Sequence, residues 1–203
     1  MQYRAFQPDI EISGASLMAV FGGFGPLQTI VNRMLRRDGL VDHACTVDDA
    51  RPVASCIDID GWYLQQAWLD TMREIDHSFG TEILFNIGAE IPSHAVFPIS
   101  AIDIHSALES IDVAYHLNHR RAGRRMYDPA TQTMLDGIGH YGYDKLSPTH
   151  ILATCVTPYP CEFDLGIVVT MARRFQPRTI VEHVGNECRR HGAQACTYSL
   201  RWG

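Results

Sequence analysis

The spacing of apolar residues changes once along the chain, near Arg125, and this change limits the possible folds more than any other feature. Before it, apolar residues recur every three or four positions, as on one face of a helix. After it, short runs between turn residues alternate apolar and polar positions, as in half-buried strands. Helices followed by strands predict an α+β domain, with N-terminal helices, a small antiparallel sheet and a helix packed on it.

The first part of the chain predicts four helices. The glycine-rich run Gly22 to Pro26 lacks the lysine and hydroxyl residue of a phosphate loop, so we interpret it as a turn that leads into the first helix. Glycine, proline and capping residues set the limits of the other three. These helices are Leu64 to Phe79, ended by Gly80; Thr81 to about Glu90, ended before Pro92; and the Pro98 to Asn118 segment, capped by Ser100 and Asp103.

The second part predicts two strands, a helix and a terminal hairpin, in that order. Acidic residues follow Cys161 in the first turn of the predicted helix, where the helix dipole favours them. The strands are Ile138 to Tyr143 and His150 to Val156, and the hairpin joins Thr179–Val184 to Ala195–Trp202.

A polar segment from Val41 to Asp60 divides the chain, because it is rich in aspartate and lacks helical periodicity. We therefore predict that residues 1–60 form an N-terminal extension with one helix, packed on the core. Residues 61–203 would form the ligand-binding α+β domain.

Charge and hydropathy exclude several classes of protein. A balance of 17 basic against 23 acidic residues gives a net charge of -6, which provides no electrostatic footprint for nucleic acid. No apolar stretch reaches the roughly 18 residues of a membrane span, and the first residues do not resemble a signal peptide. We therefore expect a cytoplasmic protein, independent of membranes, in which the six cysteines stay reduced and serve metal binding or redox chemistry.

Three of these cysteines suggest a metal site. Cys188 and Cys196 lie at the two ends of the loop in the predicted hairpin, and Cys161 lies at a helix start, where a thiolate is favoured. Three thiolates and one further ligand would complete a tetrahedral zinc shell, with His183 and Glu182 as the nearest candidates and Glu187 as a third. Alternatively, these are free cysteines buried as small apolar residues.

The end of the chain resembles a known family. Tyr159-Pro160-Cys161, the helix after it, and Cys188-x7-Cys196 with the following strand are similar to the 4-vinyl reductase domain, also found in sensor domains of phenol-responsive bacterial regulators. The resemblance covers roughly residues 138–203 and implies a structural zinc held by the three cysteines, beside a mostly apolar ligand pocket. Those regulators have a glutamate three positions before the second cysteine. This chain has Gly185 there, so we assign His183 as the fourth ligand.

Histidines gather in the middle of the sequence, where His116 and His119 also have a helical metal-ligand spacing. Each alone is equally compatible with a surface or hydrogen-bonded core histidine. As a group they suggest a pocket for a small hydrophobic or tetrapyrrole-like ligand. The predicted ligand-binding residues are Trp68, His105, Tyr115, His116, His140 and Tyr141.

The leading prediction is a small-molecule-binding sensor or accessory protein with a structural zinc site, which acts through a partner or as a homodimer. A haem-based gas or redox sensor is the alternative, because the resembled fold is related to haem nitric-oxide-binding domains. The segment Ala101 to Leu108 is similar to their axial-histidine helix, with His105 as the iron ligand, although their Tyr-x-Ser-x-Arg motif is absent. A tetrapyrrole-related enzyme that uses Cys161 is the third hypothesis, without any recognisable hydrolase or metalloprotease motif to support it.

Overall fold

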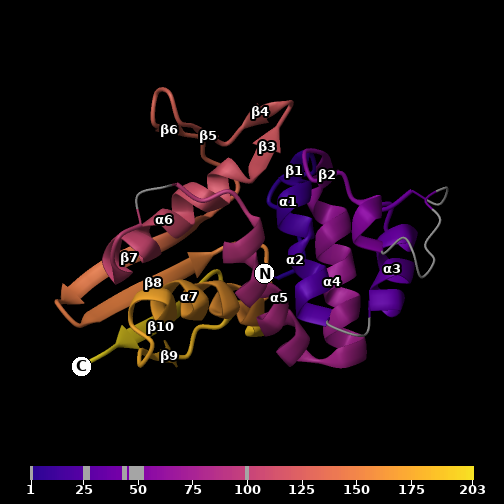
Figure 1. Ribbon diagram of the computed structural model, residues 1–203. Helices are drawn as coiled ribbons and strands as arrows, with labels where there is room; N and C mark the ends of the chain where they lie inside the picture. The colour runs from indigo at the N-terminus through magenta and orange to yellow at the C-terminus, as the bar shows by residue number, and fades with distance from the viewer. Residues whose placement is uncertain (1, 25–27, 43–44, 46–52, 99–100) are drawn as a thin grey trace.

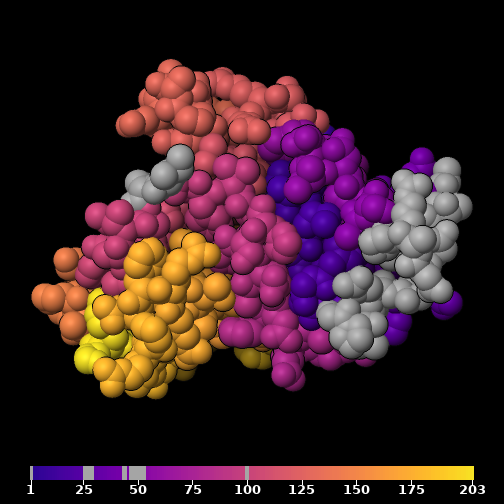
Figure 2. Space-filling model, viewed as in Figure 1, coloured from indigo at the N-terminus to yellow at the C-terminus, as the bar shows by residue number. Residues whose placement is uncertain are grey.

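Helix α5 (Thr81–His94) lies at the centre of the molecule, between two groups of elements (Figure 1). The structure is a computed structural model that describes residues 2–24, 28–42, 45, 53–98 and 101–203. On one side lie the short helices α1 (Gly14–Leu17) and α2 (Ala19–Phe24) with α3 (Gln28–Arg37) and α4 (Gln65–Phe79). In Figure 2 the magenta surface of the central segment lies between the indigo N-terminal part and the orange C-terminal part.

The other side is an antiparallel sheet with two helices packed on it. Its strand order is β7-β8-β10-β9, and α6 (Ile104–Leu117) and α7 (Cys161–Phe175) lie side by side against the sheet (Figure 1). The register pairs Cys196 with Cys155 and Tyr198 with both Ala153 and His183. The strands are β7 (His140–Ser147), β8 (His150–Val156), β9 (Ile180–Val184) and β10 (Cys196–Arg201), with the short helix η3 (Arg189–His191) between the last two.

A second sheet joins the beginning of the chain to its middle. Strand β1 (Ile10–Ser13) pairs antiparallel with β2 (Trp62–Leu64) on one side and β3 (His119–Arg121) on the other. Strand β3 also pairs with β4 (Arg124–Arg125), and β5 (Tyr127–Asp128) pairs with β6 (Thr133–Met134). One connected cluster of buried apolar side chains runs from Ile10 to Leu200, so both groups of elements share a core.

The α+β prediction is confirmed, and so are the terminal hairpin, strand β8 and the helix that ends at Gly80. Strands β1 to β6 were not predicted, because each is at most four residues long and shows little alternation. Helix α5 continues through Pro92, which lies within its last turn, where few backbone hydrogen bonds remain to be lost.

The start of α6 and the glycine-rich run differ from what the sequence predicts. Helix α6 begins at Ile104, and its capping box joins Asp103 to Ser106, so the predicted start near Pro98 is wrong. Ser100 lies outside the described residues, as do Gly25 and Pro26 of the predicted glycine turn and most of the polar segment. Gly22 and Gly23 belong to α2 and not to a turn.

The expectation that all six cysteines are reduced is wrong for two of them. Cys45 forms a disulfide bond with Cys56, the last residue of the short helix η2 (Val53–Cys56), and their Cα atoms lie 5.9 Å apart, within the usual range. The other four cysteines are free thiols. Among the described residues, no helix combines the length and apolar character needed to cross a membrane.

Two glycines allow α5 and α7 to cross in close contact. A Cβ atom at Gly88 would lie 2.0 Å from the carbonyl oxygen of Phe163, and one at Gly166 would lie 2.2 Å from that of Phe85. These neighbours are backbone atoms and cannot rotate away. The helix pair that connects the two halves therefore depends on glycine at both positions.

We expect Gly88→Ala to lower the free energy of unfolding by about 1–3 kcal/mol, because the added methyl group overpacks the helix crossing. Without a close contact, the same change inside a helix would stabilise it by up to about 1 kcal/mol. Urea unfolding followed by circular dichroism measures the difference. The control is Ser93→Ala at an exposed position of α5, which should change stability by less than about 0.5 kcal/mol; a stabilising effect of Gly88→Ala would contradict the account.

Candidate functional site

An apolar cavity lies where the two groups of elements meet. The space within it amounts to about 390 Å³, which includes solvent at its open side. The centre of a water-sized sphere can move through about 40 Å³ of it, several times the roughly 10–15 Å³ that one water molecule needs. Its wall consists of Ile12, Ser16, Ile91, Ala95, Phe97, Ile111, Ala114, Tyr115, Asn118, His119, Tyr141, Tyr159, Phe163 and Ile167.

The single histidine among these described lining residues is held inside the wall. The Nδ1–H group of His119 donates to the carbonyl oxygen of Tyr115 at 2.6 Å, and its Nε2 accepts from the Tyr159 hydroxyl at 2.7 Å. Gln65 donates to the same hydroxyl at 3.2 Å. Burial lowers the pKa of His119 to about 4, so the ring is neutral at pH 7.

Other polar groups in the wall also have partners within the protein. Asn118 accepts from the Ser13 hydroxyl and from the backbone N–H of Val96, and it donates to the carbonyl oxygens of Val96 and Ala114. The Tyr115 hydroxyl donates to the carbonyl oxygen of Ile138 at 2.5 Å. Because these groups gain little from a polar ligand, the cavity suits an apolar or aromatic molecule.

The structure brings together only some of the predicted ligand-binding residues. Tyr115 and Tyr141 line the cavity, with ring centroids 5.3 Å apart. Trp68 is fully buried in the core on α4, away from the cavity wall. His105 lies at a surface groove beside Trp202 and hydrogen-bonds Tyr143.

The two remaining predicted residues, His116 and His140, form a separate cluster with Asp112. Their rings lie 4.9 Å apart, outside the cavity wall. The cavity and the histidine cluster are therefore distinct features of the fold.

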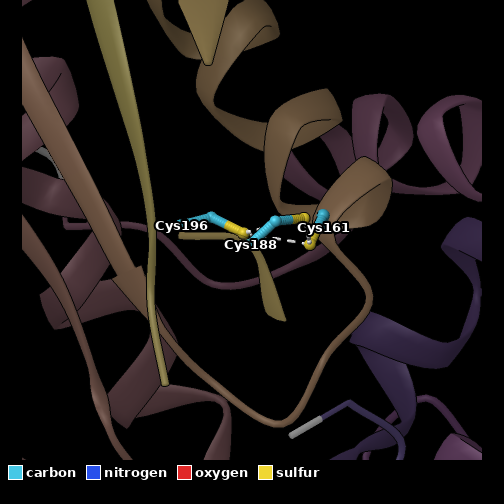
Figure 3. A group of neighbouring side chains, drawn as sticks. All are labelled: Cys161, Cys188 and Cys196. Carbon is cyan, nitrogen blue, oxygen red and sulfur yellow. Dashed lines mark hydrogen bonds between the residues drawn. The ribbon is translucent and has the colours of Figure 1, made fainter. Parts of the chain in front are cut away.

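The three predicted cysteines of the metal site meet beside the start of α7 (Figure 3). The sulfur of Cys161 lies 3.0 Å from that of Cys196 and 3.5 Å from that of Cys188, and the third separation is 3.9 Å. They come from the first turn of α7, the residue before η3 and the first residue of β10. The start of α7 thus meets the two ends of the loop that leads into β10.

Among the three cysteines, the thiolate form is most favoured at Cys196. A hydrogen bond from the Cys161 thiol, with further bonds from Arg189 and His183, lowers the pKa of Cys196 to about 3. The same hydrogen bond and burial raise the pKa of Cys161. Of these two sulfurs, Cys196 is therefore the one at which the thiolate is favoured.

Two features around the sulfurs resemble the surroundings of a bound metal. The Gln2 side chain donates to the Cys161 sulfur at 2.8 Å, and the backbone N–H of Arg189 donates to the Cys196 sulfur at 3.3 Å. His183 is on the neighbouring strand, with its ring 5.4 Å from that of Tyr198, close enough for the bond to Cys196 already described. The structure thus brings three sulfurs together as candidate ligand atoms, and His183, which lies beside Cys196, is not one of this group.

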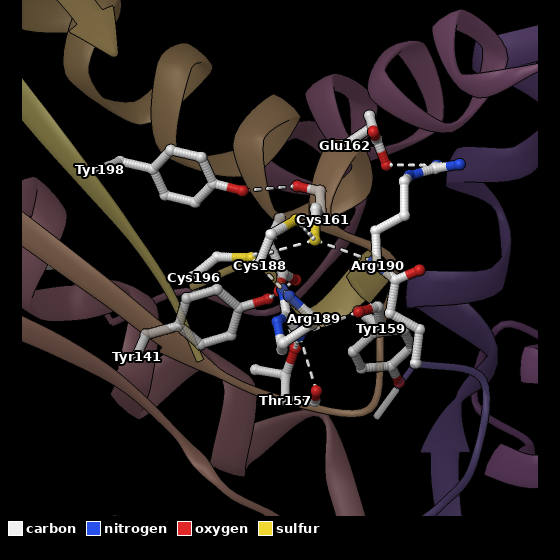
Figure 4. A network of polar contacts seen from close by, with 12 residues as sticks. Tyr141, Thr157, Tyr159, Cys161, Glu162, Cys188, Arg189, Arg190, Cys196 and Tyr198 are labelled. Carbon is white, nitrogen blue, oxygen red and sulfur yellow. Dashed lines mark hydrogen bonds and ion pairs between the residues drawn. The ribbon is translucent and has the colours of Figure 1, made fainter. Parts of the chain in front are cut away.

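Beside the cysteines lies Arg189 (Figure 4), which forms a buried ion pair with Asp164. The side chains of Arg189 and Asp164 are both fully buried and contact each other. Arg189 also donates to the carbonyl oxygens of Thr157 and Tyr159 at 2.6 and 2.8 Å. Asp164 accepts from the hydroxyls of Tyr141 and Thr157 at 2.5 and 2.7 Å.

This ion pair connects the cysteine cluster to the cavity. Arg189 follows Cys188 in sequence and its backbone N–H donates to Cys196, whereas Asp164 holds the hydroxyl of Tyr141, a residue of the cavity wall. A movement of Tyr141 would therefore change the contacts of Asp164 and, through Arg189, those of the loop that carries the cysteines.

Comparisons with solved structures show a likeness over nearly the whole chain. An H-NOX protein from S. oneidensis, solved in the Fe(II)NO ligation state, has a TM-score of 0.58 and 12% identity over 94% of this chain and 98% of its own. A Tt H-NOX has a TM-score of 0.56 and 14% identity over 94% of each chain. A Cs H-NOX has a TM-score of 0.54 and 14% identity, over 94% of this chain and 96% of its own.

At these identities the likeness shows the fold alone, and the fold is that of H-NOX domains. No protein-family model matches the sequence, and no curated protein matches it.

Sequence reasoning missed the residues that hold the site together. In the sequence Arg189 is one of two adjacent arginines, and Asp164 is an acidic residue in the first turn of a predicted helix. Their full burial is a consequence of the fold that no spacing reveals. The histidine cluster had one signal in the sequence, because Asp112 stands four positions before His116 on the same helix face.

We expect Asp164→Asn to lower the free energy of unfolding by about 3–5 kcal/mol, because it leaves the Arg189 charge buried without its counter-ion. The control is Glu162→Gln on the same helix, which removes the partner of the half-exposed Arg190 and should cost less than about 1 kcal/mol. Chemical unfolding of both variants gives the comparison. Equal losses in the two variants would show that the buried pair has no special role.

Proposed function

We propose that this protein is a small-molecule-binding sensor or accessory protein whose ligand, apolar or aromatic, occupies the cavity between the two groups of elements. The observation that carries this proposal is the cavity wall, in which the polar side chains of His119, Asn118 and Tyr159 already bond to other parts of the protein. Burial of an apolar ligand there would need no new polar partner. Tyr141 would respond to a ligand in the cavity and transmit the change to Asp164, because its hydroxyl donates a hydrogen bond to that carboxylate.

A structural zinc at Cys161, Cys188 and Cys196, with His183 as the fourth ligand, belongs to the same proposal. Tetrahedral zinc with Zn–S bonds near 2.3 Å holds its sulfurs about 3.8 Å apart, and the separations of 3.5 and 3.9 Å lie near this value, whereas the 3.0 Å between Cys161 and Cys196 would have to widen by about 0.8 Å. The donors from Gln2 and the Arg189 backbone would stabilise the thiolates. Zinc would cross-link α7, η3 and β10 and take no part in a reaction.

The likeness of residues 138–203 to the 4-vinyl reductase domain supports this assignment, since that family combines a cysteine zinc site with an adjoining apolar pocket. We also propose that the protein belongs to that family and that residues 1–60 form an extension packed on the ligand-binding part. We further propose that it forms a homodimer and functions in the cytoplasm.

A haem-binding gas sensor is the second candidate, and the likeness to H-NOX proteins favours it. The described cavity does not fit a haem in this arrangement. Both nitrogens of His119 are engaged, His105 lies at another groove, and no lysine or arginine among the described lining residues could pair with propionates. An absorption spectrum of the purified protein with added haemin separates the candidates, since only the second predicts a saturable Soret band that His105→Ala abolishes.

The cysteine site should give about one zinc per chain when the purified protein is measured by elemental mass spectrometry. Cys196→Ser should lose most of it, because the thiolate with the lowest pKa is removed from the shell. The control is Cys155→Ala, which removes a buried free thiol opposite Cys196 in the sheet and should keep the metal. Wild-type protein that stays free of zinc after refolding with added zinc would rule out the cysteine site. Equal retention of zinc in Cys196→Ser and Cys155→Ala would rule it out as well.

Four isoleucines of the cavity wall, Ile12, Ile91, Ile111 and Ile167, provide methyl reporters for nuclear magnetic resonance. We expect benzene or phenol to shift these methyl signals saturably, while the exposed Ile102 and Ile180 stay unchanged. Ala114→Leu should abolish the shifts by filling the space between α6 and the other wall elements.

Shifts that persist in Ala114→Leu, or that appear equally at Ile102 and Ile180, would mean that the probes bind elsewhere. A wild-type protein whose cavity methyls ignore both probes would remove the support for an aromatic ligand.

A further inference from the structure

One cluster of ligand-type side chains has no part in the proposed sensor. Asp112 and His116 lie one turn apart on α6, and His140 is the first residue of β7, which packs against that helix. Each offers one candidate ligand atom, and these atoms lie within 4.8 Å of one another. None of the three belongs to the cavity wall or to the cysteine cluster.

His116 is the anchor of this cluster, because its side chain is fully buried and rigidly held. Its Nδ1 lies 2.8 Å from the carbonyl oxygen of Asp112, an arrangement in which Nδ1 carries the proton and donates it. Its Nε2 has no hydrogen-bond partner among the described residues. A buried nitrogen lone pair without a partner is costly, and a metal ion is one group that would satisfy it.

The same hydrogen bond is the usual support of a metal-binding histidine. Such a ring donates one N–H to a carbonyl or carboxylate, which fixes the tautomer and leaves the other nitrogen for the metal. Burial also lowers the pKa of His116, which keeps the ring neutral and able to coordinate at pH 7.

Asp112 is oriented in a corresponding way. Its Oδ1 accepts from the backbone N–H of Tyr141 at 2.9 Å, which leaves Oδ2 directed at Nδ1 of His140, 3.2 Å away. His140 is 44% exposed, so an ion can enter from solvent on its side. The exposed Asp136 lies 3.5 Å from the other nitrogen of His140 and adds negative charge at this entrance.

We propose that Asp112, His116 and His140 bind a divalent first-row transition metal such as zinc, cobalt or nickel, at a second site separate from the cysteines. Two imidazoles and one carboxylate suit these ions, whereas magnesium and calcium prefer oxygen ligands alone. Three protein ligands leave at least one coordination position for water or a small anion.

Only a small adjustment is needed for binding. Ligand atoms around a tetrahedral ion lie about 3.4 Å apart for bonds near 2.1 Å, and the three candidate atoms already lie within 4.8 Å of one another, so no pair must approach by more than roughly 1.4 Å. The Asp112 carboxylate lies 3.5 Å from Nδ1 of His116, so it turns together with the half-exposed His140 ring to meet an ion on Nε2. The alternative is a hydrogen-bonded His–Asp pair that binds no metal.

Histidine ring signals in protein labelled with ¹⁵N at its ten histidines distinguish the two sites in one titration. Paramagnetic Co²⁺ bound at the proposed site should broaden the signals of His116 and His140, with saturation at one equivalent. Co²⁺ at the cysteines should instead broaden His183, which lies beside that cluster. The outcome for His116 and His140 therefore does not depend on the zinc proposal.

His140→Ala should weaken Co²⁺ binding at this site at least about 100-fold, as judged by broadening of His116, because one of three ligands is lost. Asp112→Asn is the second variant, since it keeps an oxygen for the N–H of Tyr141 and removes only the charge. The matched control is His77→Ala, an exposed histidine on α4, which should leave the affinity unchanged.

Unbroadened His116 and His140 signals at millimolar Co²⁺ in folded wild-type protein would overturn the proposal. So would an affinity that is the same in wild type, His140→Ala and Asp112→Asn, because the ion would then bind through other groups.

Discussion

The buried ion pair between Arg189 and Asp164 is the interaction on which the functional half of the molecule depends. Two fully buried charges are tolerated only when each is neutralised and its remaining hydrogen-bond capacity is filled. Thr157, Tyr159 and Tyr141 fill it except at Nε of Arg189, so the turn before α7, the first turn of that helix and strand β7 are fixed around one point. The loop that carries Arg189 is fixed with them, and this positions the three cysteines.

The same network also forms one side of the cavity. Tyr141 bonds to Asp164 and Tyr159 bonds to His119, and both rings face the empty space. The opposite side comes from β1, α1 and the end of α5, which the close crossing of α5 and α7 at Gly88 and Gly166 holds in place. A cavity between two packed groups of elements, with a polar network behind one wall, is an arrangement through which a small ligand could act on a distant surface.

Apolar periodicity and turn residues predicted the parts of the fold that short stretches of sequence determine. The helix ending at Gly80 and the hairpin around Cys188 and Cys196 follow from periodicity and turn residues, and the α+β class follows from their order. The short strand β1 and its pairing with β3 join residues more than 100 positions apart, and no local signal shows this. The cysteines were found because thiols are chemically distinctive, whereas the cavity joins common apolar residues from seven elements or their flanks, which only the three-dimensional arrangement selects.

The central claim is that the cysteine site and the cavity belong to one connected unit. The most direct test follows the methyl signals of Ile111 and Ile167 while a chelator removes the proposed zinc and added zinc restores it. The account predicts that both cavity signals shift on removal and return on restoration, because loss of the metal releases the loop of Arg189 and thereby Asp164 and Tyr141. Cavity signals that stay in place while zinc is lost would contradict it.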